Sequence, residues 1–193
     1  MEWTATGRAG DSRCVLCRKG KALPLSHDHK PADPVELGRI EAAGGFVTEA
    51  GRINGNLNLS RALGDLKYKG DFSRPPSKQI ITAEPDVVKH DLQKGDEFIV
   101  LACDGIWDVM SNQQAVDFVS TRLKKGLKPG VIAEQMFEHC IADDVRRDRA
   151  EIAPRLDHKI LNPNQRVLCS QPKVTQGIGG DNMTAIIVRL PTR

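Results

Sequence analysis

An unbroken apolar run that ends in an acidic residue constrains the fold of this chain most. Residues 98–103 are apolar without alternating polar positions, which is typical of a strand buried on both faces. The run ends at Asp104 and Gly105, a pair common in tight turns, and Asp108 follows four residues after Asp104. This stretch alone leaves two hypotheses open: a strand that closes on a turn, or a rigid strand that presents carboxylates to a metal ion.

A second acidic residue precedes another apolar strand. Asp181 follows a glycine-rich turn and leads into residues 185–188, which are all apolar. Asp104 therefore leaves one buried strand and Asp181 enters another, so adjacent strands would bring both carboxylates to one ion. Mg²⁺ and Mn²⁺ prefer such oxygen ligands, whereas the cysteines and histidines are too dispersed to form a zinc site.

Composition excludes several classes of protein. The 193 residues are enough for one domain with a core, and 28 Lys and Arg against 25 Asp and Glu are scattered along the chain, which argues against nucleic-acid binding. No apolar run approaches the roughly 20 residues that span a membrane. Five cysteines, an odd number without framework spacing, indicate reduced thiols and an intracellular protein, and Cys14 and Cys17 fall on opposite faces of a predicted strand.

Turn and capping signals predict the remaining elements. Lys19-Gly20 separates two apolar runs and predicts a hairpin, and a capping box begins at Ser111. The expected elements are a hairpin at 13–18 and 21–26, a helix from Asp33-Pro34 with Glu36 completing its cap, short strands at 46–60, a surface loop at 67–78, and helices that start after Ser111 and at Pro129. Residues 143–176 are polar, proline-containing and without periodicity, so we expect an insertion there.

Seven motifs, in order along the chain, resemble the metal-dependent protein serine/threonine phosphatases of type 2C. They are Gly10-Asp11-Ser12-Arg13, Asp28-His29-Lys30-Pro31, Ala43-Gly44-Gly45, Arg52-Ile53-Asn54-Gly55, Ser60-Arg61-Ala62-Leu63-Gly64-Asp65, Cys103-Asp104-Gly105-Ile106-Trp107-Asp108 and Gly180-Asp181-Asn182-Met183-Thr184. The resemblance implies an α+β fold in which two antiparallel β-sheets form a sandwich flanked by helices.

The resemblance also implies a chemistry. Members of this family hold two Mg²⁺ or Mn²⁺ ions, sometimes with a weaker third, and a metal-activated water hydrolyses phosphoserine or phosphothreonine in proteins. By motif, Asp104 and Asp181 would be catalytic ligands of the pair, and Asp108 and Asp11 would hold the third ion. Residues 46–74 match the family's flap beside the cleft.

Within the flap, Arg61 and Asp65 would either contact substrate or form the ion pair and turn that fix it. The expected partners are phosphoprotein substrates, with no nucleic acid and no membrane. We expect a cytoplasmic or nuclear location, and a monomer if the domain is complete.

The family's Asp-Gly-His-Gly motif and its phosphate-binding arginine have no counterpart in these residues. The chain therefore resembles the carboxy-terminal portion of the catalytic domain, with the amino-terminal part of the domain missing, and we expect this polypeptide alone to be inactive. The alternative is a non-catalytic interaction or regulatory fragment of a phosphatase.

Overall fold

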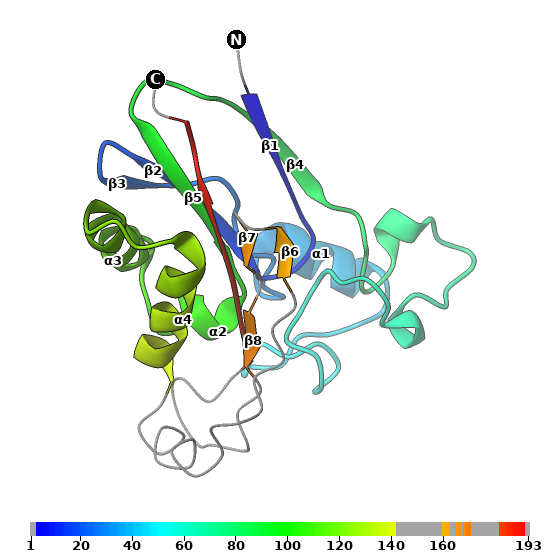
Figure 1. Cartoon of the computed structure of the whole chain (residues 1–193). Coiled ribbons are helices and arrows are strands. Elements are labelled where there is room, and N and C mark those ends of the chain that lie inside the picture. Colours follow the sequence, from blue (N-terminus) through cyan, green and yellow to red (C-terminus); the bar gives the residue numbers. More distant parts are fainter. Residues whose placement is uncertain (1–2, 142–159, 163–164, 167, 171–181, 192–193) are drawn as a thin grey trace. The chain divides into compact units, whose positions relative to one another are not determined.

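The computed structural model describes residues 3–141, 160–162, 165–166, 168–170 and 182–191. Its chain divides into two compact units (Figure 1). Unit 1 comprises residues 13–25 and the described residues from 91 onward, and unit 2 comprises residues 3–12 and 26–90. Each unit is described by itself below.

Unit 1 is built on a five-stranded antiparallel sheet. The order of its strands is β3-β2-β5-β9-β8, so the two predicted apolar strands, β5 and β9, are direct neighbours. The strands are β2 (Arg13–Arg18), β3 (Lys21–Pro24), β5 (Asp96–Ala102), β8 (Leu168–Ser170) and β9 (Met183–Arg189). The predicted hairpin is confirmed, because β2 and β3 pair across Lys19-Gly20 with Arg18 opposite Lys21.

The strand β5 is buried on both faces, as its unbroken apolar run predicts. Phe98, Val100 and Ala102 belong to a core cluster that includes residues of the helices, whereas Ile99 belongs to a second cluster with Cys14 and Leu16. Each fully buried side chain of this size stabilises the fold by about 1.5–3 kcal/mol relative to exposure. The middle strand therefore anchors the residues that follow its end.

Three helices pack on the face of this sheet that carries Phe98, Val100 and Ala102 (Figure 1). They are α2 (Asp104–Trp107), α3 (Asn112–Lys124) and α4 (Pro129–Cys140). The predicted capping box of α3 is confirmed: the Gln114 backbone N–H donates to Ser111 Oγ at 3.3 Å, and the Ser111 N–H donates to Gln114 Oε1 at 2.8 Å. These bonds fix where α3 begins.

The two closely spaced cysteines of β2 do lie on opposite faces of the sheet. Cys14 packs in the cluster with Ile99 and Cys17 in the cluster with the helices, and both side chains are buried. The prediction that they are small core side chains is confirmed.

The insertion predicted at 143–176 lies largely outside the described residues, so it stays a prediction. Its residues 143–159 and several others are among those not described. Three short strands are described within it: β6 (Ile160–Asn162), β7 (Gln165–Arg166) and β8, which pairs with β9. Strands of two or three residues are too short for an alternating pattern to reveal them in the sequence.

Unit 2 holds the other helices and a two-stranded sheet. Its elements are β1 (Trp3–Arg8), α1 (Pro34–Ala42), the short 3₁₀ helices η1 (Leu66–Tyr68) and η2 (Pro76–Lys78), and β4 (Asp86–Asp91), which pairs with β1 and reaches the boundary with unit 1. The strands predicted at 46–60 are present only as isolated bridges of Ile53 to Val47 and Leu57. Asn54 and Gly55 have positive φ angles, which interrupt an extended strand.

The predicted class, α+β with antiparallel sheets and packed helices, is confirmed. Among the described helices, none is long and apolar enough to cross a membrane.

Candidate metal-binding site

Asp104 begins a helix rather than a hairpin turn. Its side-chain Oδ1 accepts the Gly105 N–H at 2.9 Å, and its carbonyl oxygen accepts the Asp108 N–H at 2.8 Å. Trp107 is buried and donates its Nε1–H to the Ala102 carbonyl at 2.7 Å, which ties α2 to the end of β5. As a result Asp104 is half-buried at a rigid position, and Asp108 is exposed one turn later.

Cys103 connects the end of β5 to the beginning of β9. Its N–H donates to the Thr184 carbonyl at 3.1 Å, and its Sγ accepts the Thr184 N–H at 3.2 Å. The thiol in turn donates to the Asn182 carbonyl at 3.3 Å. Burial raises the pKa of this thiol, so it remains protonated and available as a donor. These bonds hold Asn182 beside the residue that precedes Asp104.

Gly105 is required by the same close approach. A Cβ atom at this position would overlap the Asn182 carbonyl oxygen, so a larger residue would push the two chain segments apart. The prediction that the two apolar strands are adjacent is thus confirmed, since β5 pairs with β9 and Asn182 lies against Gly105. Asp181 lies outside the described residues, and its role as a ligand stays a prediction.

Asp11 lies in unit 2, in the segment that follows β1. Its side chain is buried, and Oδ2 is 3.2 Å from Lys30 Nζ. Within the part of the chain that the structure describes, no three His, Cys, Asp or Glu side chains are grouped so that they could hold a metal ion. The ligand roles of Asp104, Asp108 and Asp11 therefore stay predictions.

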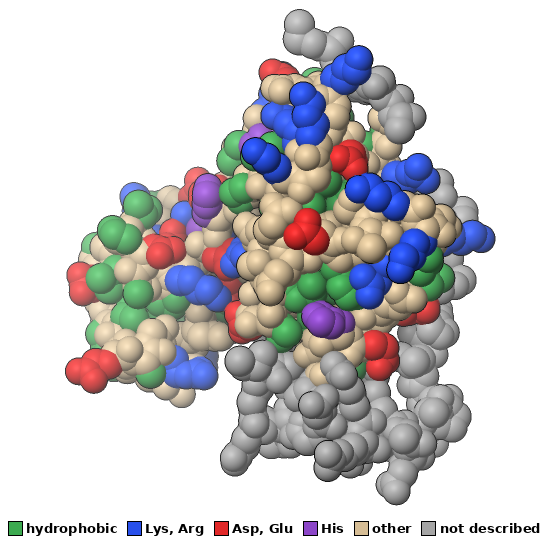
Figure 2. All heavy atoms as spheres, turned by 90° about the vertical axis from the view of Figure 1, so that its left-hand side faces the viewer, with side chains coloured by type: hydrophobic (Ala, Val, Ile, Leu, Met, Phe, Trp, Pro, Cys, Tyr) green, Lys and Arg blue, Asp and Glu red, His purple; other side chains and the backbone are tan. Residues whose placement is uncertain are grey.

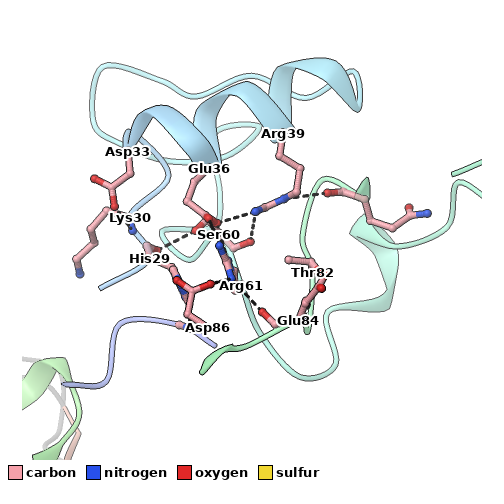
Figure 3. Close-up of polar contacts among 12 residues, drawn as sticks. His29, Lys30, Asp33, Glu36, Arg39, Ser60, Arg61, Thr82, Glu84 and Asp86 are labelled. Atoms are coloured by element: carbon pink, nitrogen blue, oxygen red, sulfur yellow. Dashed lines mark hydrogen bonds and ion pairs between the residues drawn. The ribbon is translucent and has the colours of Figure 1, made fainter. Parts of the chain in front are cut away.

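Arg61 is the centre of an ion-pair network in unit 2 that joins the buried Glu36 to the exposed Asp86 (Figure 3). Its Nη2 donates to Glu36 Oε1 at 2.6 Å and its Nη1 to Asp86 Oδ1 at 2.7 Å, and it also donates to the Glu84 carbonyl at 3.2 Å. Burial lowers the pKa of Arg61, but the bonds to Glu36 and Asp86 outweigh that effect and raise it. The guanidinium is therefore permanently charged and committed to these partners.

The role of Glu36 in the structure differs from the one that the sequence predicted. It was predicted to complete the cap of α1, but the Asp33 side chain makes no cap bond and instead accepts the Lys30 N–H at 3.1 Å. Glu36 is 2% exposed and accepts from Arg61 and Arg39, the latter at 2.7 Å. Burial alone would raise its pKa, yet hydrogen bonding to Arg61, Ser60 and Arg39 lowers the pKa to about 2.

His29 and Asp65 also have defined contacts in unit 2. The Gly10 N–H donates to His29 Nδ1 at 3.2 Å, so the ring proton sits on Nε2, which is 2.9 Å from Asp86 Oδ2. Asp65 has a left-handed backbone with φ of 51°, and its carbonyl accepts the Tyr68 N–H at 3.0 Å. Arg61 thus forms an ion pair and Asp65 a turn, and contact of either residue with substrate stays a prediction.

The comparison with known families agrees with the motifs. The family model described as Protein phosphatase 2C matches residues 3–148, most of the chain. This chain belongs to the protein phosphatase 2C family. It is 57% identical over 136 residues to Protein phosphatase 2C homolog 2 of Schizosaccharomyces pombe. The aligned region covers 70% of this chain and 36% of that protein. It is 43% identical over 186 residues to human Protein phosphatase 1G. The aligned region covers 93% of this chain and 29% of that protein.

Solved structures share the fold of this chain. The crystal structure of a phosphatase from a pathogenic strain of Toxoplasma gondii matches with a TM-score of 0.69 and 27% identity, over 96% of this chain and 47% of that one. A Caenorhabditis elegans sex determining protein shares the fold, with a TM-score of 0.61 and 23% identity over 98% of this chain and 37% of that one. This chain spans less than half the length of each of these four proteins.

Proposed function

We propose that this chain supplies the β5–β9 side of the active site of a metal-dependent protein serine/threonine phosphatase. The observation that supports it best is the clasp of Cys103 and Gly105 on Asn182, because it holds the start of β9 next to Asp104. The substrates would be phosphoserine and phosphothreonine in proteins. A cytoplasmic or nuclear location and a monomeric state when the domain is complete belong to the same proposal.

The donors at the end of β5 suit a hard cation. Asp104 and Asp108 offer carboxylate oxygens, while the Cys103 thiol is committed as a donor to Asn182. Asp104 and Asp181 would hold a pair of Mg²⁺ or Mn²⁺ ions, and Asp108 and Asp11 a weaker third. When bound, two such ions lower the pKa of a shared water and neutralise charge on the phosphoryl group.

The protein's own contribution is to keep these carboxylates in place. Asp104 is fixed by β5 and by the Trp107 bond to Ala102, so little side-chain and backbone freedom is lost when a ligand binds. In unit 2, the bonds of Arg61 to Glu36 and Asp86 fix the base of the flap segment. A rigid base positions the rest of the flap for substrate.

We expect these 193 residues alone to be inactive. We expect no hydrolysis of a phosphothreonine peptide in millimolar Mn²⁺, because the sequence lacks the Asp-Gly-His-Gly motif that supplies the bridging carboxylate in this family. Turnover comparable to that of a complete family member, abolished by Asp104→Asn, would contradict the expected inactivity.

A chimaera tests the phosphatase function itself. The matching 136 residues of Protein phosphatase 2C homolog 2, which are 57% identical, would be replaced by those of this chain. We expect Mn²⁺-dependent hydrolysis of the phosphothreonine peptide, lost in the Asp104→Asn chimaera. A chimaera that melts cooperatively but hydrolyses nothing would refute the proposal.

A further inference from the structure

A cavity lies at the end of the sheet opposite to Asp104. Its volume is about 260 Å³, and all of its lining belongs to unit 1. The lining comes from the start of β5, from the last two turns of α3 and from the end of β9: Gly95, Asp96, Glu97, Phe98, Ser120, Leu123, Lys124, Arg189 and Leu190. The cavity reaches up β5 to Phe98, and the six residue steps from Phe98 to Asp104 span about 20 Å at 3.4 Å per residue.

The size and apolar part of the cavity limit what it can bind. Pockets for drug-sized ligands and cofactors measure roughly 300–1,000 Å³, so this cavity is smaller than most of them. Phe98 is fully buried beneath it, and Leu123 and Leu190 are half-buried at its walls. Such a space fits one or two apolar side chains of a peptide rather than a cofactor.

The acidic side chains of the lining are already engaged. Asp96 Oδ1 accepts from Arg18 Nε at 2.6 Å, and its side chain is only 3% exposed. Glu97 Oε1 accepts the Gly20 N–H at 2.9 Å. The charge of Asp96 is thus compensated by Arg18, and the Glu97 carboxylate is engaged by the Gly20 backbone.

The basic side chains around the cavity are exposed. Among the described residues, no ion pair involves Lys124 or Arg189, and both are exposed. Lys19 lies over Gly95, since its Cγ is 2.7 Å from the place of a Cβ at Gly95. Lys94 and Lys125 are exposed next to lining residues in the sequence. Figure 2, viewed from the side of α3 and α4, shows Lys and Arg side chains spread over this face.

We propose that this cavity is a docking site for an acidic peptide segment of a partner protein that inserts one apolar side chain. The apolar walls would bury that side chain, and the basic rim would attract the flanking carboxylates. The proposal does not depend on phosphatase activity, because the cavity is remote from Asp104 and binding can be measured without turnover.

The test uses fluorescence anisotropy with a labelled peptide in which one leucine is flanked by glutamates. We expect saturable binding that weakens about tenfold in the Lys124→Glu/Arg189→Glu variant, since each reversed charge removes a modest attraction and adds a repulsion. A peptide with serine in place of the leucine should also bind about tenfold more weakly, because it buries no apolar side chain.

The control is Lys78→Glu/Lys89→Glu, which makes the same change in net charge on two exposed lysines of unit 2 outside the flap. It should leave peptide affinity unchanged. An equal loss of peptide affinity in both variants, or equal affinity for the leucine and serine peptides, would mean non-specific charge attraction and would overturn the proposal. No saturable peptide binding, or binding only to vesicles that contain phosphatidylserine, would overturn it as well. Thermal melting of each variant verifies that it is folded.

Discussion

At the scale of single residues, the Glu36–Arg61 pair makes the strongest prediction about stability. Glu36→Gln removes a buried charge that Arg61 and Arg39 share, and leaves both guanidinium groups undercompensated. Breaking a buried pair in this way costs about 3 kcal/mol. Urea unfolding measures it, with Glu41→Gln on the exposed side of α1 as the control for losing one carboxylate. A loss below about 0.5 kcal/mol, the usual limit for surface changes, would contradict the account of the network.

The same carboxylate predicts how stability depends on pH. The pKa of Glu36 is about 2 in the folded chain against an ordinary 4.5, so the unfolded chain takes up the proton first as pH falls. The stabilising contribution is complete above pH 4.5 and is lost progressively towards pH 2. In Glu36→Gln, the free energy of unfolding should therefore fall less steeply across that range. Equal slopes for the two proteins would show that Glu36 is not linked to folding.

Gly105 tests the clasp between β5 and β9. In Gly105→Ala the new Cβ would overlap the Asn182 carbonyl, and such overpacking costs about 1–3 kcal/mol. The matched control is Gly38→Ala in α1, where no heavy atom lies within 4 Å of the new Cβ and helix propensity favours alanine by up to about 1 kcal/mol. Thermal melting should show opposite shifts for the two variants. Equal shifts would argue against the close approach at Asn182.

At the scale of elements, α3 depends on its capping box. Ser111→Ala removes the oxygen that accepts the Gln114 N–H, and the loss of such a cap costs about 1 kcal/mol. Thr121→Ala, an exposed change in the same helix, should be neutral or slightly stabilising because alanine has the higher helix propensity. Chemical denaturation separates the two. If Thr121→Ala were the more destabilising change, the cap would not be the feature that fixes the start of α3.

Some elements could be predicted from the sequence and others could not. The unbroken apolar run of β5 and the capping box of α3 are local patterns, and both are present as expected. The strand β8 has three residues and is defined by its pairing with β9, a long-range contact that no local pattern encodes. Glu36 looked like a capping residue because position alone is ambiguous, and only the fold reveals that Arg61 lies next to it.

At the scale of the whole molecule, the sequence predicted that the two apolar strands would be adjacent, and β5 and β9 do pair. Asp104 follows the strand β5, and the neighbour strand β9 begins at Met183, so the adjacency of β5 and β9 agrees with two apolar runs that each lie near an aspartate. The clasp itself was not predictable, because it depends on a thiol and a glycine meeting a backbone carbonyl across the sheet.

The most direct test of the proposed site is a titration of the ¹⁵N-labelled chain with Mn²⁺, followed by amide NMR. Mn²⁺ broadens signals near its binding site, so the amides of Asp104, Gly105 and Asn182 should broaden first, while that of Asp96, at the other end of β5, stays sharp. The effect should disappear in Asp104→Asn and in Asp181→Asn. Broadening at the same amides that persists in both variants would contradict the claim that these two aspartates form one side of a metal site.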